Sequence, residues 1–442
     1  MASRQPMRVV CGTLGFLAAA VFAMFAAVSS GGAEQPRAAR AQPSASKARP
    51  FSPGRLTQVF RGTDKNGRSE RMRNNELDNI ERLHLDDPGV APALWRVIEP
   101  SLNVEQAPDS LLRAIRLYSL LDDDHGAAHI VSLLSAADPR IVLAAIDILA
   151  ERRPPEALRP LMKLREHPGY TTHYGLRHAV VSAVAKFDDP ASVDFLVSGI
   201  ARLDGQVKYV AARQLARLTG QNFGSQSDKW RQWWEANRKD FRVAASASAK
   251  AAAPASAVAI PWDYAVPQFF GTPIYAKRVV FVIDKSKSMQ SSVDGVTRLD
   301  DAQKQLEAAI RGLPDDAWFE IIAYNDSEQV YSGKLTPATP GEKSGAAQFL
   351  YSLTADGKTD IYDTLVDALA VDSNLEAILL LSDGDPNVGS IVDRATIVQR
   401  ITQQNAARRI SISTIGIDAQ GASEEFLKRL ASDNFGEYRA SR

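Results

Sequence analysis

Three oxygen-bearing side chains follow a short apolar run in the second half of the chain. The run, Val279–Ile283, consists of β-branched and aromatic residues, which is typical of a strand buried on both faces of a parallel sheet. Asp284, Ser286 and Ser288 come directly after it in the pattern Asp-x-Ser-x-Ser. Because ligands of open α/β sheets bind at the carboxyl ends of the strands, this carboxylate and these two hydroxyls are placed to bind a hard divalent cation.

Two later segments supply further oxygen ligands of the same kind. Thr359 lies in a Gly-Lys-Thr-Asp loop that precedes an amphipathic helix expected over Ile361–Ala370. Asp383 lies in an acidic turn that follows a second buried strand, expected over Ala377–Leu381. We therefore predict that both side chains reach the metal site at the end of the first strand.

The three segments together resemble the metal-ion-dependent adhesion site of von Willebrand factor A domains. The resemblance covers about residues 276–442, and the five positions of the site are matched by Asp284, Ser286, Ser288, Thr359 and Asp383. It implies a bound Mg²⁺, for which Mn²⁺ or Ca²⁺ can substitute, with the hydroxyls as ligands and the aspartates binding directly or through water. It also implies one open coordination position, which an acidic side chain of a partner protein fills.

Three lysines occupy the same turns. Lys287 stands where the family often has a glycine between the two serines, and Lys285 and Lys358 lie nearby in the sequence. If these side chains face the partner, they strengthen the preference for an acidic ligand. The alternative is that they are solvated lysines with no part in binding.

The elements expected around these residues alternate between strands and helices. Besides the elements above, the pattern predicts strands over 318–324 and 410–417, a short final strand over 436–438, and helices over 299–310, 345–353, 390–403 and 424–430. Such an alternation indicates an α/β doubly wound, Rossmann-like domain, which we place at residues 271–442.

A different pattern occupies residues 76–242. Four blocks of similar sequence recur at spacings of 31, 34 and 32 residues, starting at Ala114, Ala145, Ala179 and Ala211. This spacing predicts stacked helix pairs, and the segment resembles an α-solenoid of HEAT-like repeats. Breaks between the expected helices fall at Asp138-Pro139, Pro154-Pro155 and Asp189-Pro190, where proline suits a first helical turn. The array could bind a second protein on its concave surface, or it could be a spacer.

The remaining segments are expected to be a leader and two linkers. Residues 1–33 resemble a secretory signal, although the 20-residue apolar run Val9–Val28 is also long enough for an N-terminal membrane anchor. Residues 34–75 are basic and aperiodic, and residues 243–270 are rich in alanine and serine at their start, so we expect a flexible linker in each place. The leader indicates an exported protein that is periplasmic, extracellular or held at the cell envelope.

The composition is that of a multidomain globular protein. The chain has 442 residues, 45% of them apolar, and its formal net charge is zero, which argues against a nucleic-acid partner. The single cysteine, Cys11, lies in the expected leader, so the mature protein would have no disulfide or thiol chemistry.

These observations favour a binding protein over an enzyme. We expect a metal-dependent adhesion or scaffold protein that binds an acidic residue of its partner. One alternative is a metal-free scaffold that acts through its helical repeats. Another is a phosphoryl-transfer enzyme in which Asp284 is a nucleophile or a metal ligand, but no histidine follows His178 to serve as a general acid.

Overall fold

The computed structural model describes residues 50–62, 68–121, 125–243 and 260–441. The expected leader at residues 1–33 lies outside the described residues. So do parts of the two expected linkers, namely residues 34–49, 63–67 and 244–259. Among the helices that are described, none is long and apolar enough to cross a lipid bilayer.

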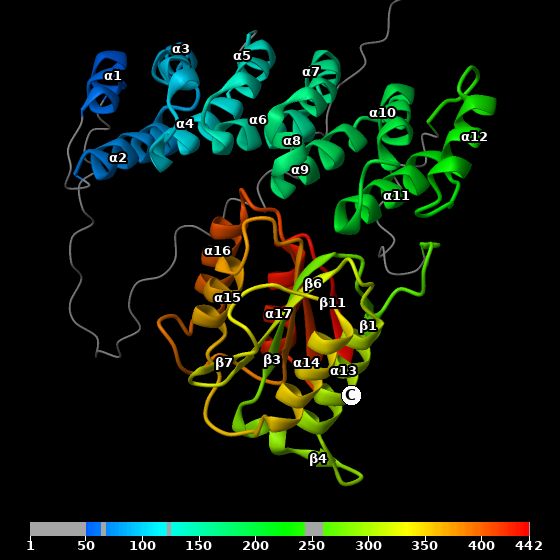
Figure 1. The fold of residues 1–442 in the computed structure, drawn as a ribbon. Coiled ribbons are helices and arrows are strands. Elements are labelled where there is room, and N and C mark those ends of the chain that lie inside the picture. Colours follow the sequence, from blue (N-terminus) through cyan, green and yellow to red (C-terminus); the bar gives the residue numbers. More distant parts are fainter. Residues whose placement is uncertain (1–49, 63–67, 122–124, 244–259, 442) are drawn as a thin grey trace, which may run out of the picture. The chain divides into compact units, whose positions relative to one another are not determined.

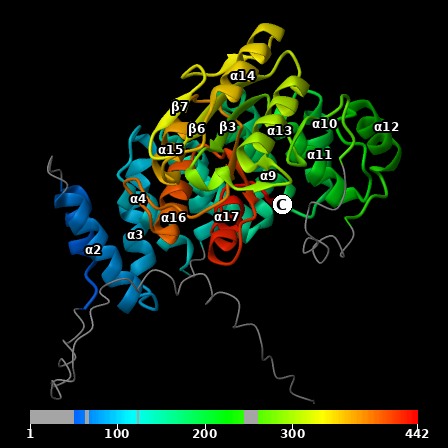
Figure 2. The same ribbon diagram turned by 90° about the horizontal axis from the view of Figure 1, so that it is seen from below.

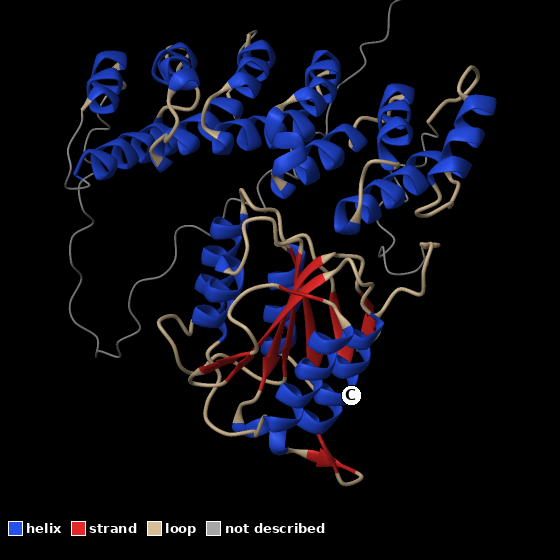
Figure 3. Cartoon of the chain, viewed as in Figure 1, coloured by secondary structure: helices blue, strands red, loops and turns tan. Residues whose placement is uncertain are grey.

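The first part of the described chain is entirely helical (Figures 1 and 3). Its α-helices are α1 (Pro53–Arg61), α2 (Arg68–Leu83), α3 (Val90–Ile98), α4 (Asp109–Ser119), α5 (Gly126–Ser132), α6 (Pro139–Arg152), α7 (Leu158–Lys163), α8 (Pro168–Thr172), α9 (Tyr174–Ala185), α10 (Pro190–Ile200), α11 (Gly205–Thr219) and α12 (Ser227–Asn237). Short 3-10 helices at Glu99–Asn103, Leu133–Ser135, Pro155–Ala157 and Leu164–Glu166 extend the turns between them.

The four similar sequence blocks become four consecutive neighbours in this array. Helices α4, α6, α9 and α11 contact one another in that order, and the alanine that starts each block is buried: Ala114, Ala145, Ala179 and Ala211. Small side chains at these positions let neighbouring helices approach closely. The prediction of stacked helical repeats is therefore confirmed.

The proline breaks between helices also act as predicted. Helices α6 and α10 begin at Pro139 and Pro190, and the preceding aspartates cap them. Asp138 accepts a 2.8 Å hydrogen bond from the backbone nitrogen of Arg140 with one oxygen and a 2.7 Å bond from that of Ala107 with the other. Because Ala107 precedes helix α4, this buried carboxylate ties one repeat to the next.

The helical array begins earlier than the sequence pattern indicated. Helix α1 and the first part of α2 lie within residues 34–75, where we expected a linker. Leu56 of α1 and Leu77 and Ile80 of α2 are fully buried in the core of the array. The many charged residues around these few apolar positions obscure the helical pattern in the sequence. Packing against the rest of the array, rather than local propensity, therefore determines that this segment is helical.

The second part of the described chain is an α/β domain. Its strands are β1 (Gln268–Phe269), β2 (Thr272–Pro273), β3 (Arg278–Asp284), β4 (Ser292–Val293), β5 (Val296–Thr297), β6 (Trp318–Tyr324), β7 (Glu328–Val330), β8 (Thr336–Pro337), β9 (Ala377–Ser382), β10 (Ser411–Ile417) and β11 (Tyr438–Ser441). Its α-helices are α13 (Arg298–Gly312), α14 (Pro340–Ser352), α15 (Ile361–Ala370), α16 (Arg394–Asn405) and α17 (Ala422–Ser432), and a 3-10 helix spans Lys287–Gln290.

The central sheet has the strand order β11-β10-β9-β3-β6-β7. The strands from β11 to β6 are parallel, whereas β7 and β8 pair with β6 in the antiparallel direction. Figure 2 shows α13 and α14 on one side of the sheet and α15, α16 and α17 on the other. The domain is a doubly wound three-layer fold, as the alternation of patterns predicted.

Strand β3 is buried on both faces. Val279, Phe281 and Ile283 belong to the core beneath α13 and α14, whereas Val280 and Val282 belong to the core beneath α15, α16 and α17. This explains why its sequence is continuously apolar rather than alternating. The arrangement fixes the end of the strand, and therefore Asp284, at the centre of the sheet edge.

The α/β domain starts slightly before the expected boundary. Strand β1 lies within residues 243–270, and it pairs with β2 in an antiparallel hairpin. Phe269 is fully buried in the core that contains β3. The burial of Phe269 therefore makes the end of the expected linker part of the α/β domain.

Candidate metal centre

Two neighbouring parallel strands bring the predicted ligands to the same edge of the sheet. Strands β3 and β9 pair in register up to Ile283 and Leu381. Asp284 is the last residue of β3 and pairs with Tyr324 of β6, and Asp383 directly follows Ser382, the last residue of β9. The chain places β6 on one side of β3 and β9 on the other, which makes this edge a topological switch point of the kind that binds ligands.

Asp284 is fully buried, and the protein satisfies both of its oxygens. Oδ1 accepts a 2.8 Å hydrogen bond from the backbone nitrogen of Ser286. Oδ2 accepts hydrogen bonds from Ser382 Oγ at 2.9 Å and from Tyr324 Oη at 3.3 Å. Burial raises the pKa of Asp284 to about 6, and the nearby charge of Asp383 acts in the same direction. A cation bound beside these carboxylates would relieve both effects.

The two serines and Asp383 form a short chain of oxygen atoms. Ser286 Oγ and Ser288 Oγ are 3.0 Å apart, and Ser288 Oγ donates a 2.7 Å hydrogen bond to Oδ1 of Asp383. In octahedral Mg²⁺ coordination with bonds of about 2.1 Å, adjacent ligand oxygens lie about 3.0 Å apart. The three oxygens therefore have the spacing of neighbouring ligands around such an ion.

The loop that carries Thr359 lies against the Asp-x-Ser-x-Ser turn. The backbone nitrogen of Lys287 donates to the carbonyl of Gly357 at 3.2 Å, and that of Asp356 donates to the carbonyl of Lys285 at 2.9 Å. Gly357 has a φ of 72°, and a Cβ there would lie 2.4 Å from a carboxylate oxygen of Asp326, so this turn favours glycine.

Thr359 itself is buried, and it is anchored to the loop after β9. Its backbone nitrogen donates to Oδ1 of Asn387, and its carbonyl accepts from the backbone nitrogen of Asn387, both at 3.0 Å. These contacts join the threonine loop to the segment that follows Asp383. The structure thus brings all three predicted segments together at the end of β3.

Sequence reasoning missed Arg298, which contacts one of the predicted ligands. Arg298 Nη1 donates a 2.7 Å hydrogen bond to Oδ2 of Asp383, whose side chain is fully buried. The sequence pattern does not indicate this contact, because the contact depends on where helix α13 starts relative to the sheet edge. Ser382, by contrast, stands immediately before Asp383 and could have been included from the sequence.

Comparison with known protein families finds a match in each part of the described chain. Residues 277–440 match the von Willebrand factor type A domain, and residues 127–216 match HEAT repeats. Residues 277–440 form a von Willebrand factor type A domain. The helical array that precedes this VWA domain in the sequence contains HEAT repeats, as predicted.

Two human relatives match a little more than a third of this chain. Human inter-alpha-trypsin inhibitor heavy chain H2 is 27% identical over 175 residues, which are 36% of this chain and 17% of that protein. Human heavy chain H4 is 30% identical over 180 residues, which are 38% of this chain and 18% of that protein. The match therefore spans less than a fifth of the length of these relatives.

Solved structures of low identity cover a similar share of this chain. A von Willebrand factor type A protein from Catenulispora acidiphila aligns with a TM-score of 0.33 and 21% identity, covering 38% of this chain and 40% of that one. BatB from Bacteroides thetaiotaomicron aligns with a TM-score of 0.30 and 16% identity, covering 37% of this chain and 89% of that one.

The three lysines near the VWA site have different environments. Lys285 is buried, and its amine lies 3.5 Å from the carboxylate of Asp356. Lys287 and Lys358 are exposed in the two adjacent turns. Lys287 and Lys358 are therefore placed either to face a partner or simply to be solvated. Lys285, in contrast, contacts the neighbouring loop of its own domain.

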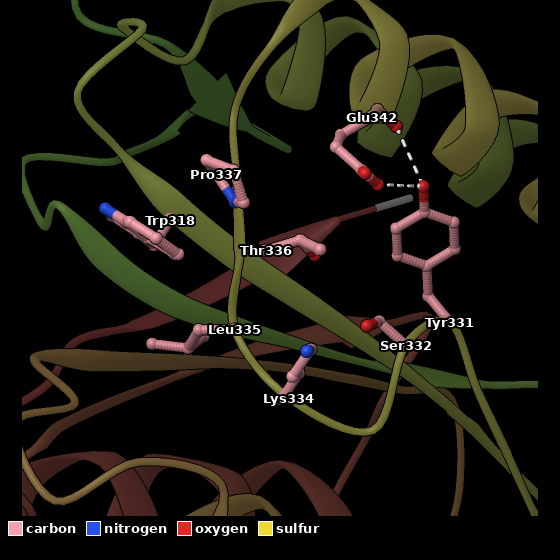
Figure 4. A pocket seen from close by; sticks show the side chains of 8 residues that line it. All are labelled: Trp318, Tyr331, Ser332, Lys334, Leu335, Thr336, Pro337 and Glu342. Carbon is pink, nitrogen blue, oxygen red and sulfur yellow. Dashed lines mark hydrogen bonds between the residues drawn. The ribbon is translucent and has the colours of Figure 1, made fainter.

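A hollow of about 570 Å³ lies elsewhere on the VWA domain (Figure 4). Trp318, which begins β6, pairs with Pro337 at this hollow, while Tyr324 at the other end of β6 pairs with Asp284. The hollow is therefore at the opposite end of the strand from the metal centre. Its Tyr331 hydroxyl donates a 2.7 Å hydrogen bond to the carboxylate of Glu342, so these two polar groups satisfy each other.

Proposed function

We propose that this chain binds protein partners by holding a divalent metal ion that accepts an acidic side chain of the partner. The ligands of the ion are the five predicted residues, Asp284, Ser286, Ser288, Thr359 and Asp383. The ion is Mg²⁺, and Mn²⁺ or Ca²⁺ can substitute for it. The observation that carries the proposal is the 2.7–3.0 Å spacing of the Ser286, Ser288 and Asp383 oxygens.

The donor set explains why an acidic partner is favoured. Two carboxylates and three neutral hydroxyls leave a bound Mg²⁺ electrophilic, and an anionic ligand completes its coordination. Within the described ranges, no group of three or more His, Cys, Asp or Glu side chains gathers as a transition-metal site requires. The chemistry of the residues therefore supports a hard cation bound mainly by hydroxyl and carboxylate oxygens.

The surface beside the site adds apolar contacts. Strands β4 and β5 form a hairpin directly after the Asp-x-Ser-x-Ser turn, with Val293 72% exposed and Val296 40% exposed. Asp294 and Gly295 have φ values of 52° and 79°, which are those of a tight two-residue hairpin turn. A hairpin that displays valines beside a metal site suits a partner whose acidic residue has apolar neighbours.

Both alternatives to adhesion have less support. An enzymatic role for Asp284 lacks a candidate general acid, because no histidine follows His178 in the sequence. The helical repeats could act as a metal-free scaffold, and we propose that they bind a second protein beside the metal-dependent partner.

We propose that the whole protein is exported or held at the cell envelope, on the basis of residues 1–33.

A pair of matched peptides tests the proposed function. A Gly-Glu-Gly peptide and its Gly-Gln-Gly counterpart, both acetylated at the N-terminus and amidated at the C-terminus, differ only in the side-chain carboxylate. We expect the glutamate peptide to increase the apparent affinity for Mg²⁺ in isothermal titration calorimetry, because metal and carboxylate binding are linked. The glutamine peptide serves as the control. Equal effects of the two peptides, or binding that persists in chelator, would overturn the proposal.

A further inference from the structure

Arg298 links the carboxylates of Asp383 and Asp418. It is the first residue of α13, and its backbone nitrogen donates to the carbonyl of Ser291 at 2.9 Å. Its guanidinium donates to Oδ2 of Asp383 at 2.7 Å through Nη1, and to Oδ2 of Asp418 at 2.9 Å through Nη2. Asp418 directly follows β10, so Arg298 bridges the ends of the adjacent strands β9 and β10.

Because of this bridge, the two oxygens of Asp383 have different hydrogen-bond partners. Oδ2 is held by Arg298, whereas Oδ1 accepts the hydrogen bond of Ser288 Oγ and faces the hydroxyl ligands. The Asp383 side chain is fully buried, so solvent does not compete for either oxygen. A metal ion beside Ser288 therefore meets one oxygen of this carboxylate.

The other carboxylate of the site is restricted in a similar way. Asp284 Oδ1 accepts from the backbone of Ser286, and Oδ2 accepts from Ser382 and Tyr324. Neither aspartate can present two free oxygens to an ion without breaking protein hydrogen bonds. Among the two, Asp383 is the one whose second oxygen is held by a charged side chain, which makes that hydrogen bond the stronger one.

We propose that Arg298 sets the metal selectivity of the site by confining Asp383 to one-oxygen binding. This inference rests on the proposed function. Ca²⁺ takes about six to eight oxygens at about 2.3–2.6 Å and often binds both oxygens of a carboxylate, whereas Mg²⁺ takes six at about 2.1 Å. Confinement of Asp383 therefore disfavours Ca²⁺ more than Mg²⁺. Arg298 is a positioning residue, because it acts through Asp383 and not on the ion.

The test measures a ratio of affinities, because removal of a positive charge strengthens the binding of every divalent cation. We compare the dissociation constants of Ca²⁺ and Mg²⁺ in the purified chain and in the Arg298→Gln variant by isothermal titration calorimetry. We expect the Ca²⁺ affinity relative to that of Mg²⁺ to rise about tenfold in the variant, which corresponds to about 1.4 kcal/mol. A rise in both affinities with an unchanged ratio would overturn the proposal.

Arg394→Gln is the matched control. Arg394 Nε donates a 2.8 Å hydrogen bond to Oδ1 of Asp385, so this variant also removes a guanidinium from an aspartate of the same loop. It leaves both oxygens of Asp383 as they are. We expect the affinity ratio to stay at the wild-type value, and a shift equal to that of Arg298→Gln would contradict the proposal.

The wild-type chain provides a second measurement that does not depend on the folding of a variant. We expect it to bind Mg²⁺ at least about tenfold more tightly than Ca²⁺, a difference of about 1.4 kcal/mol. Equal or tighter binding of Ca²⁺ would overturn the role of Arg298 while leaving the proposed function in place. An absence of binding to either ion, with and without a carboxylate ligand, would instead reject the proposed function.

Discussion

The hydroxyl of Ser288 donates a 2.7 Å hydrogen bond to the carboxylate of Asp383, a residue that lies 95 positions later in the chain. The contact exists because β3 and β9 are neighbours in the sheet and end at the same edge. It joins the first and last segments of the predicted metal site. A metal ion that binds here would replace this hydrogen bond with two coordination bonds.

Replacement of Ser288 by alanine should weaken metal binding. The change removes one oxygen from the row formed by Ser286, Ser288 and Asp383 and leaves the fold intact, since Ser288 is exposed. We expect the affinity for Mg²⁺ or Mn²⁺, measured by calorimetry, to fall at least about tenfold. Ser291→Ala is the control, because the described contact of Ser291 with Arg298 uses its backbone carbonyl. Equal affinities in both variants would exclude Ser288 as a ligand.

Ser382→Ala should affect both metal binding and stability. Ser382 is fully buried, and its hydroxyl donates a 2.9 Å hydrogen bond to Oδ2 of Asp284. Its loss leaves a buried carboxylate with one donor fewer, so we expect the metal-free protein to lose about 1–3 kcal/mol in denaturant unfolding. We also expect metal affinity to fall about 10–100-fold, as for other residues that orient a ligand. Ser352→Ala, at the exposed end of α14, should change neither quantity.

Removal of the metal should lower the thermal stability of the VWA domain. An ion that binds the folded state alone stabilises it by about 2.7 kcal/mol at a concentration of 100 times its dissociation constant. We therefore expect the unfolding temperature in Mg²⁺ to exceed that in chelator. The difference should vanish in a variant that carries Asp284→Asn and Asp383→Asn. If this variant responds to Mg²⁺ as the wild type does, the ion binds somewhere else.

The joint between helical repeats should be sensitive to acid. Burial acts to raise the pKa of Asp138, but the hydrogen bonds from Arg140 and Ala107 outweigh it and hold the pKa below 3.8. A carboxyl with a lowered pKa stabilises the folded state above its unfolded pKa, and this contribution is lost as the pH falls through the folded pKa. We expect Asp138→Asn to cost about 1–3 kcal/mol at pH 7 and progressively less below about pH 4.

A neighbouring aspartate provides the control for this prediction. Asp109 also pairs with Arg140, at 3.1 Å, but its side chain is 86% exposed. Asp109→Asn should therefore change the unfolding free energy much less than Asp138→Asn, because exposed ion pairs contribute little. Chemical denaturation followed by circular dichroism at pH 7 and below pH 4 measures both variants. A cost for Asp138→Asn that does not vary with pH would contradict the account.

The strands at the centre of the sheet could be predicted closely from the sequence. The range expected for β6, 318–324, is the range observed, because a run that is apolar except for Glu320 has few other places in a compact domain. Helix α14 begins at Pro340, five residues before the predicted start, since Thr339 caps a first turn that carries no apolar period. The exposed hairpin of β4 and β5 was not predicted, because its valines do not enter the core.

The positions of the five candidate ligands could be predicted because each segment that carries them adjoins an element with a clear pattern. Asp284 and Asp383 come at the ends of buried strands, and Thr359 comes before an amphipathic helix. Arg298 could not be predicted in the same way. Its contact with Asp383 depends on the rotation of α13 against the sheet, which the linear sequence does not express.

The most direct test of the central claim is a calorimetric titration of the purified chain with Mg²⁺ and Mn²⁺, beside the Asp284→Asn, Asp383→Asn variant. The account predicts that the wild type binds either ion, that acetate or glutamate strengthens the binding, and that the variant loses it. Absence of binding by a folded wild-type chain, even with acetate or glutamate present, would contradict metal-dependent adhesion.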